Sequence, residues 1–320
     1  MARPFRPYPI IVGPTASGKT GISVALAKRI NGEVVSADSM QIYDEIFIGT
    51  ARPTADEMQG VPHHLLGFVP LKESYSVARY IDDADRVFRN IFSRNKTPIL
   101  CGGTGLYIQS FSENIQFFPH TPDESLRTEL KQRATTEGGA ALLEELRAVD
   151  RETADRLHEN DLNRIIRALE VYRTTGQTIS EQTRLSKAVP SPYDRCLFLL
   201  NYRDRDTLYE RIERRVDRML EDGLLDEASR VYSNDPRATV LQAIGYKELL
   251  PYFRREETLE SVIAQLKIST RHYAKRQLSW FNRMDGVRTI WLDDYADGSA
   301  VVDEITKQFT VFCEEGRRDG

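Results

Sequence analysis

The sequence has few cysteines, and they lie far apart. The 320 residues contain three, Cys101, Cys196 and Cys313, and no two of them form a Cys-x-x-Cys pair. An odd number of widely spaced cysteines predicts neither a disulfide framework nor a cysteine-ligated zinc module. We therefore expect a protein of a reducing compartment, the cytoplasm, without a zinc finger.

Long hydrophobic runs and an excess of positive charge are also missing. No apolar stretch approaches the roughly 20 residues that a membrane-spanning helix needs. The basic, proline-rich start passes directly into a short strand-like segment, so we expect neither a membrane partner nor an export signal. The net charge is −4. Because non-specific nucleic-acid binders usually carry a basic surplus, any nucleic-acid site must be a local patch.

Short buried strands alternate with helix patterns in the first hundred residues. Residues 8–12, 33–37 and 98–101 have strand character, and residues 77–92 have the spacing of a helix. Such alternation predicts a parallel sheet. Ligands of these sheets bind beyond the carboxyl ends of the strands. The residues that follow each strand are therefore the first candidates for a functional site.

The middle of the chain has a purely helical character. The sequence Thr121-Pro122-Asp123-Glu124 has the form of a capping box that opens a charged helix. Further segments with helical spacing are residues 140–149, 151–158 and 162–174. Strand character returns at residues 195–200 and again at 288–292, with helix patterns at 207–220 and 259–284 between them. We expect a P-loop NTPase-like α/β core, residues 1–118 and 195–320, interrupted by an all-helical insertion domain, residues 119–194.

The residues after the first strand match the phosphate-loop pattern Gly-x-x-x-x-Gly-Lys-Thr. They are Gly13, Pro14, Thr15, Ala16, Ser17, Gly18, Lys19 and Thr20. In this motif, backbone N–H groups surround phosphate oxygens, the lysine neutralises them, and the last hydroxyl binds Mg²⁺. A chance glycine turn is the weaker interpretation because a strand and a helix flank the loop. The motif alone does not distinguish a nucleotide from another diphosphate, so a small-molecule kinase is an alternative.

An acidic residue, Asp38, follows the second strand. In this position its carboxylate could face the bound phosphate and act as a general base. Capping of the next turn is an equally good interpretation, because aspartate commonly takes that role. In a small-molecule kinase, the same acid would bind the acceptor or Mg²⁺.

The helix pattern after Thr207 places an arginine beside its apolar stripe. Arg215 lies at the edge of the stripe, whereas Arg211, Arg214 and Arg218 point further away. A half-buried guanidinium needs an anion, and a phosphate would satisfy it. The ordinary alternative is a surface ion pair with a neighbouring glutamate, which contributes little to stability.

Taken together, the motifs resemble those of the tRNA dimethylallyltransferases of the bacterial type. In chain order they are GPTASGKT, SADSMQIY, IGTARPT, GVPHHLLG, GGTGLYIQ, NRIIRALEV, QAIGYKE and AKRQLSWF. The resemblance implies transfer of a dimethylallyl group from dimethylallyl diphosphate to N6 of adenosine 37, beside the anticodon of tRNAs that read codons beginning with U. A small-molecule kinase and a non-catalytic RNA-binding NTPase are the alternatives.

The resemblance also implies roles for individual residues. Residues 13–20 would hold the diphosphate, with Mg²⁺ on Thr20. Lys19, Thr20 and Arg215 would stabilise the leaving group, and Asp38 would accept the proton of N6. The helical insertion domain would contact the anticodon stem-loop, and we expect a monomer. The implied tRNA contacts are Asp38, Ser39, Met40, Gln41, Thr104, Arg127, Asn163, Arg164, Ile165, Ile166, Arg167, Gln242, Ala243, Ile244, Gly245, Tyr246, Lys247, Lys275, Arg276, Gln277 and Trp280.

Two further patterns have less specific interpretations. Lys267, Arg271 and Lys275 recur at every fourth residue of a long helix, so RNA phosphates could follow this cationic stripe. A solvated helix face is the ordinary alternative. The adjacent His63 and His64 lack carboxylates at metal-ligand spacing, and we expect them to be structural.

Overall fold

The structure, a computed structural model, describes residues 5–117, 123–234, 236 and 238–318. The chain divides into two units: Met1–Ser112 together with Pro192–Gly320, and Glu113–Ser191. The boundaries of the second unit thus fall a few residues before those read from the sequence, 119 and 194. Each unit has its own apolar core and is described separately.

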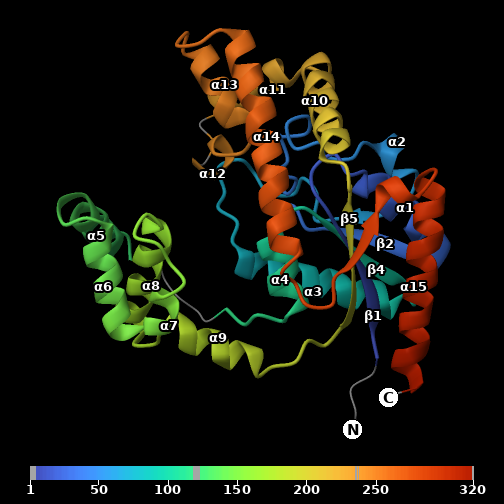
Figure 1. Cartoon of the computed structure of the whole chain (residues 1–320), viewed down its shortest axis with the longest axis horizontal. Coiled ribbons are helices and arrows are strands. Elements are labelled where there is room, and N and C mark those ends of the chain that lie inside the picture. Colours follow the sequence, from blue (N-terminus) through green and yellow to red (C-terminus); the bar gives the residue numbers. More distant parts are fainter. Residues whose placement is uncertain (1–4, 118–122, 235, 237, 319–320) are drawn as a thin grey trace. The chain divides into compact units, whose positions relative to one another are not determined.

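A parallel sheet of six strands forms the centre of the first unit (Figure 1). The strand order is β3-β2-β4-β1-β5-β6, and every pairing is parallel. The strands are β1 (Pro7–Val12), β2 (Gly32–Ser36), β3 (His63–His64), β4 (Thr97–Gly102), β5 (Asp194–Asn201) and β6 (Arg288–Trp291). The predicted fold class is confirmed. Only the two-residue edge strand β3 lacked a signal in the sequence.

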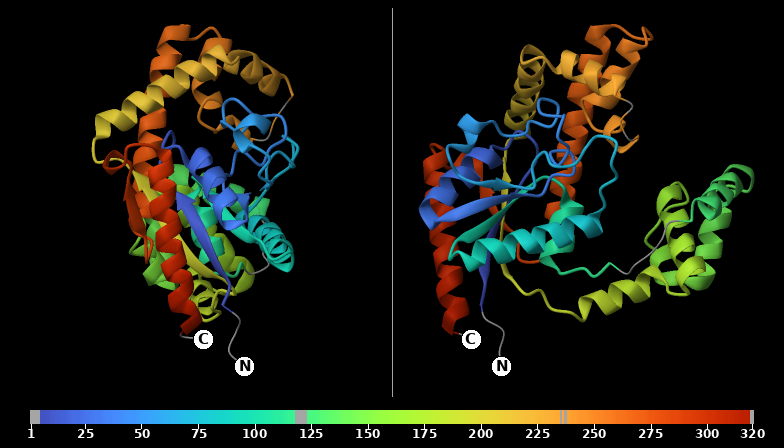
Figure 2. Two further views of the ribbon diagram at one scale, coloured as in Figure 1. Left: turned by 90° about the vertical axis from the view of Figure 1, so that its right-hand side faces the viewer. Right: turned by 180° about the vertical axis from the view of Figure 1, so that it is seen from behind.

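Helices cover both faces of this sheet, as the views of Figures 1 and 2 show. One face packs against α1 (Lys19–Ile30) and α15 (Gly298–Arg318). The other packs against α3 (Val77–Ser93), α4 (Gly105–Ser112), α10 (Arg205–Glu221) and α14 (Leu259–Phe281). Neighbouring residues of a strand face opposite sides, so Ile10 and Ile11 lie in different cores. Burial on both faces explains why the strands read as continuous hydrophobic runs.

A third apolar cluster supports the chain segment that follows β2. It joins Ile42, Tyr43 and Ile46 to residues of the C-terminal half of the unit. The helices involved are the ends of α10 and α14 together with α11 (Leu224–Ser233), α12 (Ala238–Leu241) and α13 (Tyr246–Phe253). The remaining short elements are α2 (Ala55–Met58) and the 3₁₀ helix Leu292–Asp294. This cluster fixes residues 39–52 near the carboxyl edge of the sheet.

The second unit is all-helical in its described residues. Its helices are α5 (Glu124–Thr136), α6 (Gly139–Val149), α7 (Arg151–Ala154), α8 (Leu162–Thr175) and α9 (Ile179–Lys187). Asp123 caps α5 by accepting a hydrogen bond from the N–H of Leu126; the Thr121 and Pro122 part of the predicted capping box lies outside the described residues. α7 is a single turn and thus shorter than expected. α9, which the hydrophobic pattern did not predict, opens with a capping box formed by Thr178 and Glu181.

Within the described residues, no helix combines the length and the apolar character needed to cross a membrane.

Candidate functional site

The phosphate-loop motif connects the carboxyl end of β1 to the first turn of α1. Two glycines are required by this backbone. A Cβ at Gly13 would lie 2.7 Å from the carbonyl oxygen of Leu200, and Gly18 has a φ of 81°, a conformation that favours glycine. The start of a helix of 12 residues also directs free N–H groups and a positive dipole end toward the loop. The loop therefore has the geometry of an anion-binding site.

Lys19 lies folded against this loop. Its Nζ donates hydrogen bonds to the carbonyl oxygens of Gly13, at 3.1 Å, and Pro14, at 2.8 Å. Burial lowers the pKa of Lys19 to about 8; the nearby Cys101 and Asp38 favour the charged form, whereas Arg215 opposes it. The ammonium group has no ion-pair partner in the described part of the chain. An anion bound in the loop would supply that partner.

Two hydroxyls of the loop have no protein partner among the described residues. Ser17 is buried and its Oγ makes no hydrogen bond, and the hydroxyl of Thr20 is likewise unbonded. Buried polar atoms rarely stay unpaired, so the loop is built for an oxygen-rich ligand. No group of three or more His, Cys, Asp or Glu side chains suited to a metal occurs in the described residues. The donor chemistry fits Mg²⁺ held by one hydroxyl and by phosphate oxygens.

Asp38 lies in the turn after β2, with one carboxylate oxygen engaged and the other open. Oδ1 accepts hydrogen bonds from the N–H groups of Met40, at 2.9 Å, and Gln41, at 3.3 Å. Oδ2 makes no hydrogen bond within the described residues. The carboxylate therefore caps the turn, as one interpretation of the sequence predicted, and keeps an acceptor for a ligand. The two interpretations are compatible.

The glycine turn after β4 holds the Asp38 turn in place. The N–H of Thr104 donates to the carbonyl of Ala37 at 3.1 Å, and Oγ1 of Thr104 accepts from the N–H of Ser39 at 2.9 Å. Gly102 packs directly against Ala37, where a side chain would collide with the backbone. Thr104 and Ser39, both predicted to contact the RNA, thus meet beside Asp38.

Helix α14 contacts the phosphate loop and the glycine turn after β4 through the side chain of Gln277. Its Oε1 accepts a hydrogen bond from the N–H of Thr15 at 2.8 Å, and its Nε2 donates to the carbonyl of Gly103 at 3.0 Å. The side chain is only 5% exposed. Gln277, predicted as an RNA contact, lies between the phosphate loop and the glycine turn and bonds to both. Trp280, one turn further, packs against Gly105.

Two arginines of α10 lie near the phosphate loop at the carboxyl edge of the sheet. Arg215 is half-buried and has no hydrogen bond or ion pair within the described residues; burial lowers the pKa of its guanidinium, and the charge of Asp38 partly offsets this. Arg215 lies beside the apolar stripe of α10, as the sequence predicted. Arg211 was expected to point away, yet its Nε donates to the carbonyl of Ala16 in the phosphate loop at 3.0 Å. Lys19, Arg211 and Arg215 together make this edge cationic.

A buried glutamate that the sequence analysis did not identify organises the neighbouring loop. Glu227, on α11, is 1% exposed. Its carboxylate accepts hydrogen bonds from three consecutive N–H groups, those of Phe47, Ile48 and Gly49, and from the hydroxyl of Tyr246. The next two carbonyls, of residues 50 and 51, accept from Nε2 of Gln41. Glu227 therefore connects the Asp38 turn with α13. A helical acid gives no such signal in sequence.

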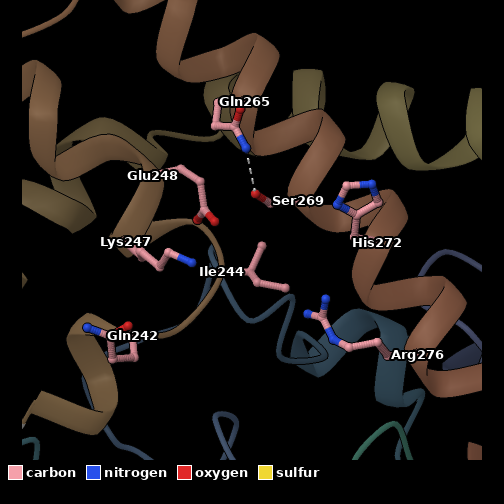
Figure 3. A pocket seen from close by; sticks show the side chains of 8 residues that line it. All are labelled: Gln242, Ile244, Lys247, Glu248, Gln265, Ser269, His272 and Arg276. Carbon is pink, nitrogen blue, oxygen red and sulfur yellow. Dashed lines mark hydrogen bonds between the residues drawn. The ribbon is translucent and has the colours of Figure 1, made fainter. Parts of the chain in front are cut away.

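A polar cavity of about 310 Å³ lies between α14 and the segment that leads into α13 (Figure 3). Its lining residues are Gln242, Ile244, Lys247, Glu248, Gln265, Ser269, His272 and Arg276. Four of these were predicted RNA contacts: Gln242, Ile244, Lys247 and Arg276. The neighbouring Ala243 and Tyr246 are buried in the third apolar cluster, together with the partly buried Met40.

The predicted cationic stripe of α14 is mostly neutralised. Lys267 pairs with Asp217 at 2.6 Å, and Arg271 pairs with Glu213. Both acids belong to α10, so these pairs join two helices. Lys275 and Arg276 are exposed and lack ion pairs in the described part of the chain, which leaves them for an external anion.

In the second unit, two predicted RNA contacts share one buried acid. Arg127 on α5 and Arg167 on α8 pair with Glu170 at 2.9 Å and 3.2 Å. Ile165 and Ile166 lie in the core of this unit, so their side chains do not face outward. Asn163 and Arg164 are exposed.

A phosphate loop after β1, an acid after β2 and half-buried cations define a P-loop α/β protein with a site suited to phosphate groups. Comparison with known proteins specifies the family. The model of the family described as IPP transferase matches residues 41–284. The chain is 45% identical over 289 residues to a tRNA dimethylallyltransferase of Caldanaerobacter subterraneus subsp. tengcongensis, covering 89% of this chain and 92% of that protein.

Two solved structures agree. The tRNA isopentenylpyrophosphate transferase of Bacillus halodurans is 41% identical with a TM-score of 0.74, covering 98% of this chain and 99% of that one. A eukaryotic dimethylallyltransferase acting on tRNA is 30% identical with a TM-score of 0.79, covering 94% of this chain and 78% of that one. The chain belongs to the IPP transferase family, the tRNA dimethylallyltransferases, and is a prenyltransferase. This assignment replaces the kinase alternative.

Proposed function

We propose that the chain transfers a dimethylallyl group from dimethylallyl diphosphate to N6 of adenosine 37, beside the anticodon of tRNAs that read codons beginning with U. The observation that carries the proposal is a pair of half-buried cations, Lys19 and Arg215. Neither has an ion pair in the described chain, and the charge of Asp38 acts on the pKa of both. Such a pair suits a polyanionic leaving group better than it suits a protein acid.

The phosphate loop would stabilise the departing diphosphate. As the allylic C–O bond breaks, the electron pair stays on the diphosphate, so negative charge grows there in the transition state. Lys19, Arg215 and the N–H groups of Ala16 and residues 18–20 are preorganised for that charge. Mg²⁺ on Thr20 would add Lewis-acid stabilisation of the same oxygens. The N–H of Thr15 takes no part because it is already bonded to Gln277.

Asp38 would accept the proton of the acceptor amine. The lone pair of adenine N6 is delocalised into the ring, so removing the proton while the C–N bond forms lowers the barrier. The open Oδ2 is the acceptor, because Oδ1 is held by two backbone N–H groups. The fixed Oδ1 orients the carboxylate, and the Thr104 contacts with Ser39 and Ala37 hold the turn.

The reacting base must leave the stacked anticodon loop to reach Asp38, at a cost of a few kcal/mol. Ser39 and Thr104, which meet beside Asp38, would contact the extruded base. Exposed residues of the helical insert, Asn163 and Arg164 among them, would contact the anticodon arm. We expect the protein to act as a monomer in the cytoplasm.

The test is incubation of the protein with unmodified tRNA, Mg²⁺ and dimethylallyl diphosphate, followed by mass spectrometry of the nucleosides. The proposal expects one prenylated adenosine per tRNA, located at position 37 by fragment analysis. Asp38→Asn should lose most of this activity, while its tRNA affinity remains near that of the wild type. An active preparation that yields no prenylated adenosine refutes the proposal.

A further inference from the structure

Glu248, on the first turn of α13, has an oxygen that lacks a partner although it is buried. Its side chain is 6% exposed. Oε2 accepts a hydrogen bond from the N–H of Gly245 at 3.0 Å, whereas Oε1 has no partner in the described chain. Leaving a buried acceptor unpaired destabilises the fold, and more so when the group is charged. A ligand that donates a hydrogen bond to Oε1 would remove this cost.

Glu248 is one of the residues that line the polar cavity between α13 and α14. Figure 3 shows the carboxylate of Glu248 and the ammonium group of Lys247 pointing into the space that His272 and Arg276 border from α14. The volume of about 310 Å³ is at the lower end for small-molecule sites, which suits a ligand of nucleotide size. Neither Lys247 nor Arg276 has an ion pair within the described residues. The cavity thus combines one unpaired acceptor with two unpaired cations.

The two features require a ligand that carries an N–H donor and an anion. A ribonucleotide with an amino-bearing base has both: an exocyclic amine for Oε1 of Glu248, and a phosphate for Lys247 and Arg276. Ile244 supplies an apolar surface for the base, and the hydrogen-bonded pair Gln265 and Ser269 adds polar groups at 3.3 Å from each other.

Helix α14 connects this cavity to the reaction site. Arg276 precedes Gln277, which holds the phosphate loop, and the guanidinium of Arg276 lies over the ring of Tyr273 at 5.8 Å. Tyr273 is close enough to Asp38 for that carboxylate to raise its pKa, although burial is the larger cause. A nucleotide in the cavity would therefore lie near the reacting adenosine.

We propose that Glu248 makes this cavity a specificity site for a second nucleotide, whose base must carry an amino group. The inference rests on the proposed function, because the expected ligand is a nucleotide of the tRNA anticodon loop other than the reacting adenosine. A free nucleotide carries the same groups and is the alternative ligand.

The experiment uses anticodon stem-loop RNAs in which single loop bases lose their amino group. At each position except the reacting adenosine, adenosine is replaced by purine riboside, guanosine by inosine and cytidine by pyrimidin-2-one riboside. For the wild-type enzyme, loss of the amino group at one position should lower kcat/KM about tenfold, because the buried acceptor of Glu248 then has no donor. If no position responds and free AMP does not compete, the inference is overturned.

Glu248→Gln makes the test specific to this atom. The amide oxygen can keep the hydrogen bond from Gly245, while the NH₂ group turns the acceptor in the cavity into a donor. The kcat/KM of the variant should fall about tenfold with the parent RNA and change little with the RNA that lacks the amino group. A merely structural defect would lower both equally, and that result contradicts the inference. Glu260→Gln, on the exposed first turn of α14, is the matched control and should behave as the wild type.

Two further measurements separate the possible outcomes. The first is competition by free nucleotides. If AMP competes, purine riboside monophosphate does not, and Glu248→Gln abolishes the competition, the occupant is a free nucleotide recognised by its amino group. Fluorescence anisotropy of the same RNAs measures their affinity without catalysis. If the wild type binds the RNAs but never prenylates them, the proposed function fails while the base preference at Glu248 remains measurable.

Discussion

The side chain of Gln277 accepts a hydrogen bond of 2.8 Å from the N–H of Thr15 and thereby joins the last turns of α14 to the phosphate loop. The same amide donates to Gly103 in the turn that positions Asp38. One side chain in α14 therefore connects the phosphate loop with the turn that holds Asp38. We expect the alignment of donor and acceptor to depend on it.

Replacing Gln277 by leucine should impair donor use. The change leaves the N–H of Thr15 and the carbonyl of Gly103 without partners, at a cost of roughly 1–3 kcal/mol each. We expect kcat/KM for dimethylallyl diphosphate to fall at least tenfold. Gln277→Glu, which keeps the acceptor for Thr15, should lose less. Steady-state kinetics at saturating tRNA compares the two variants with the wild type. An unchanged kcat/KM in the leucine variant would contradict the bridging role of Gln277.

Donor affinity should depend on pH through Lys19. Burial lowers the pKa of its ammonium to about 8 in the free enzyme, and a bound diphosphate favours the charged form, which raises that pKa. Below pH 8 the lysine is already protonated and does not alter affinity. Above pH 8 binding must take up a proton, so the Kd for the donor should rise with pH, approaching tenfold per unit. Calorimetric titration between pH 7 and 9.5 measures this; a flat profile would show that Lys19 does not contact the diphosphate.

Glu227 should act as a positioning residue for RNA binding. Glu227→Gln removes one carboxylate acceptor from the loop of residues 47–49, and Tyr246→Phe removes only the hydroxyl bond. We expect both variants to raise the KM for tRNA, several-fold for Tyr246→Phe and more for Glu227→Gln, with the donor KM unchanged.

The matched control is Glu33→Gln. Glu33 is also 1% exposed but pairs with Arg94, Lys96 and His64 at the β3 edge of the sheet. Its replacement should lower the thermal midpoint without changing either KM. If Glu227→Gln lowers only the thermal midpoint in the same way, Glu227 is structural.

The paired arginines of the insert should contribute to tRNA binding. Glu170 orients Arg127 and Arg167 from two helices. Arg127 also pairs with Glu124, whereas Arg167 contacts Glu170 through Nη1, which leaves further N–H donors for phosphate. Arg167→Ala should raise the KM for tRNA several-fold and make binding less sensitive to salt. Arg151→Ala removes an exposed charge of the same unit and serves as control. Equal effects of the two substitutions would argue against a specific role for Arg167.

The sequence predicted the elements whose patterns are local. The phosphate loop, the central strands and the helices of residues 77–92 and 259–284 follow from glycine spacing and hydrophobic periodicity, because these depend on neighbours in the chain. Strand β3 has only two residues, too few for a periodic signal. α9 carried a readable signal, the capping box of Thr178 and Glu181, which was not used.

The residues that organise the site were less accessible to sequence reasoning. The roles of Gln277 and Glu227 come from contacts across more than 170 positions of the chain, which no local pattern encodes. The stripe of Lys267 and Arg271 shows the opposite case: its spacing was correct, but acids on α10 neutralise it. Residue spacing in the sequence identifies which side chains share a helix face. Which residues pack against that face depends on the tertiary structure.

The central claim is that the glycine-rich loop anchors a departing diphosphate. Phosphorus NMR of a reaction with dimethylallyl diphosphate, tRNA and Mg²⁺, without any nucleoside triphosphate, tests it most directly. We predict that inorganic diphosphate appears in equal amount to prenylated adenosine, and that Lys19→Met and Arg215→Met each slow both together. Transfer that requires ATP, or release of orthophosphate in place of diphosphate, would contradict the account.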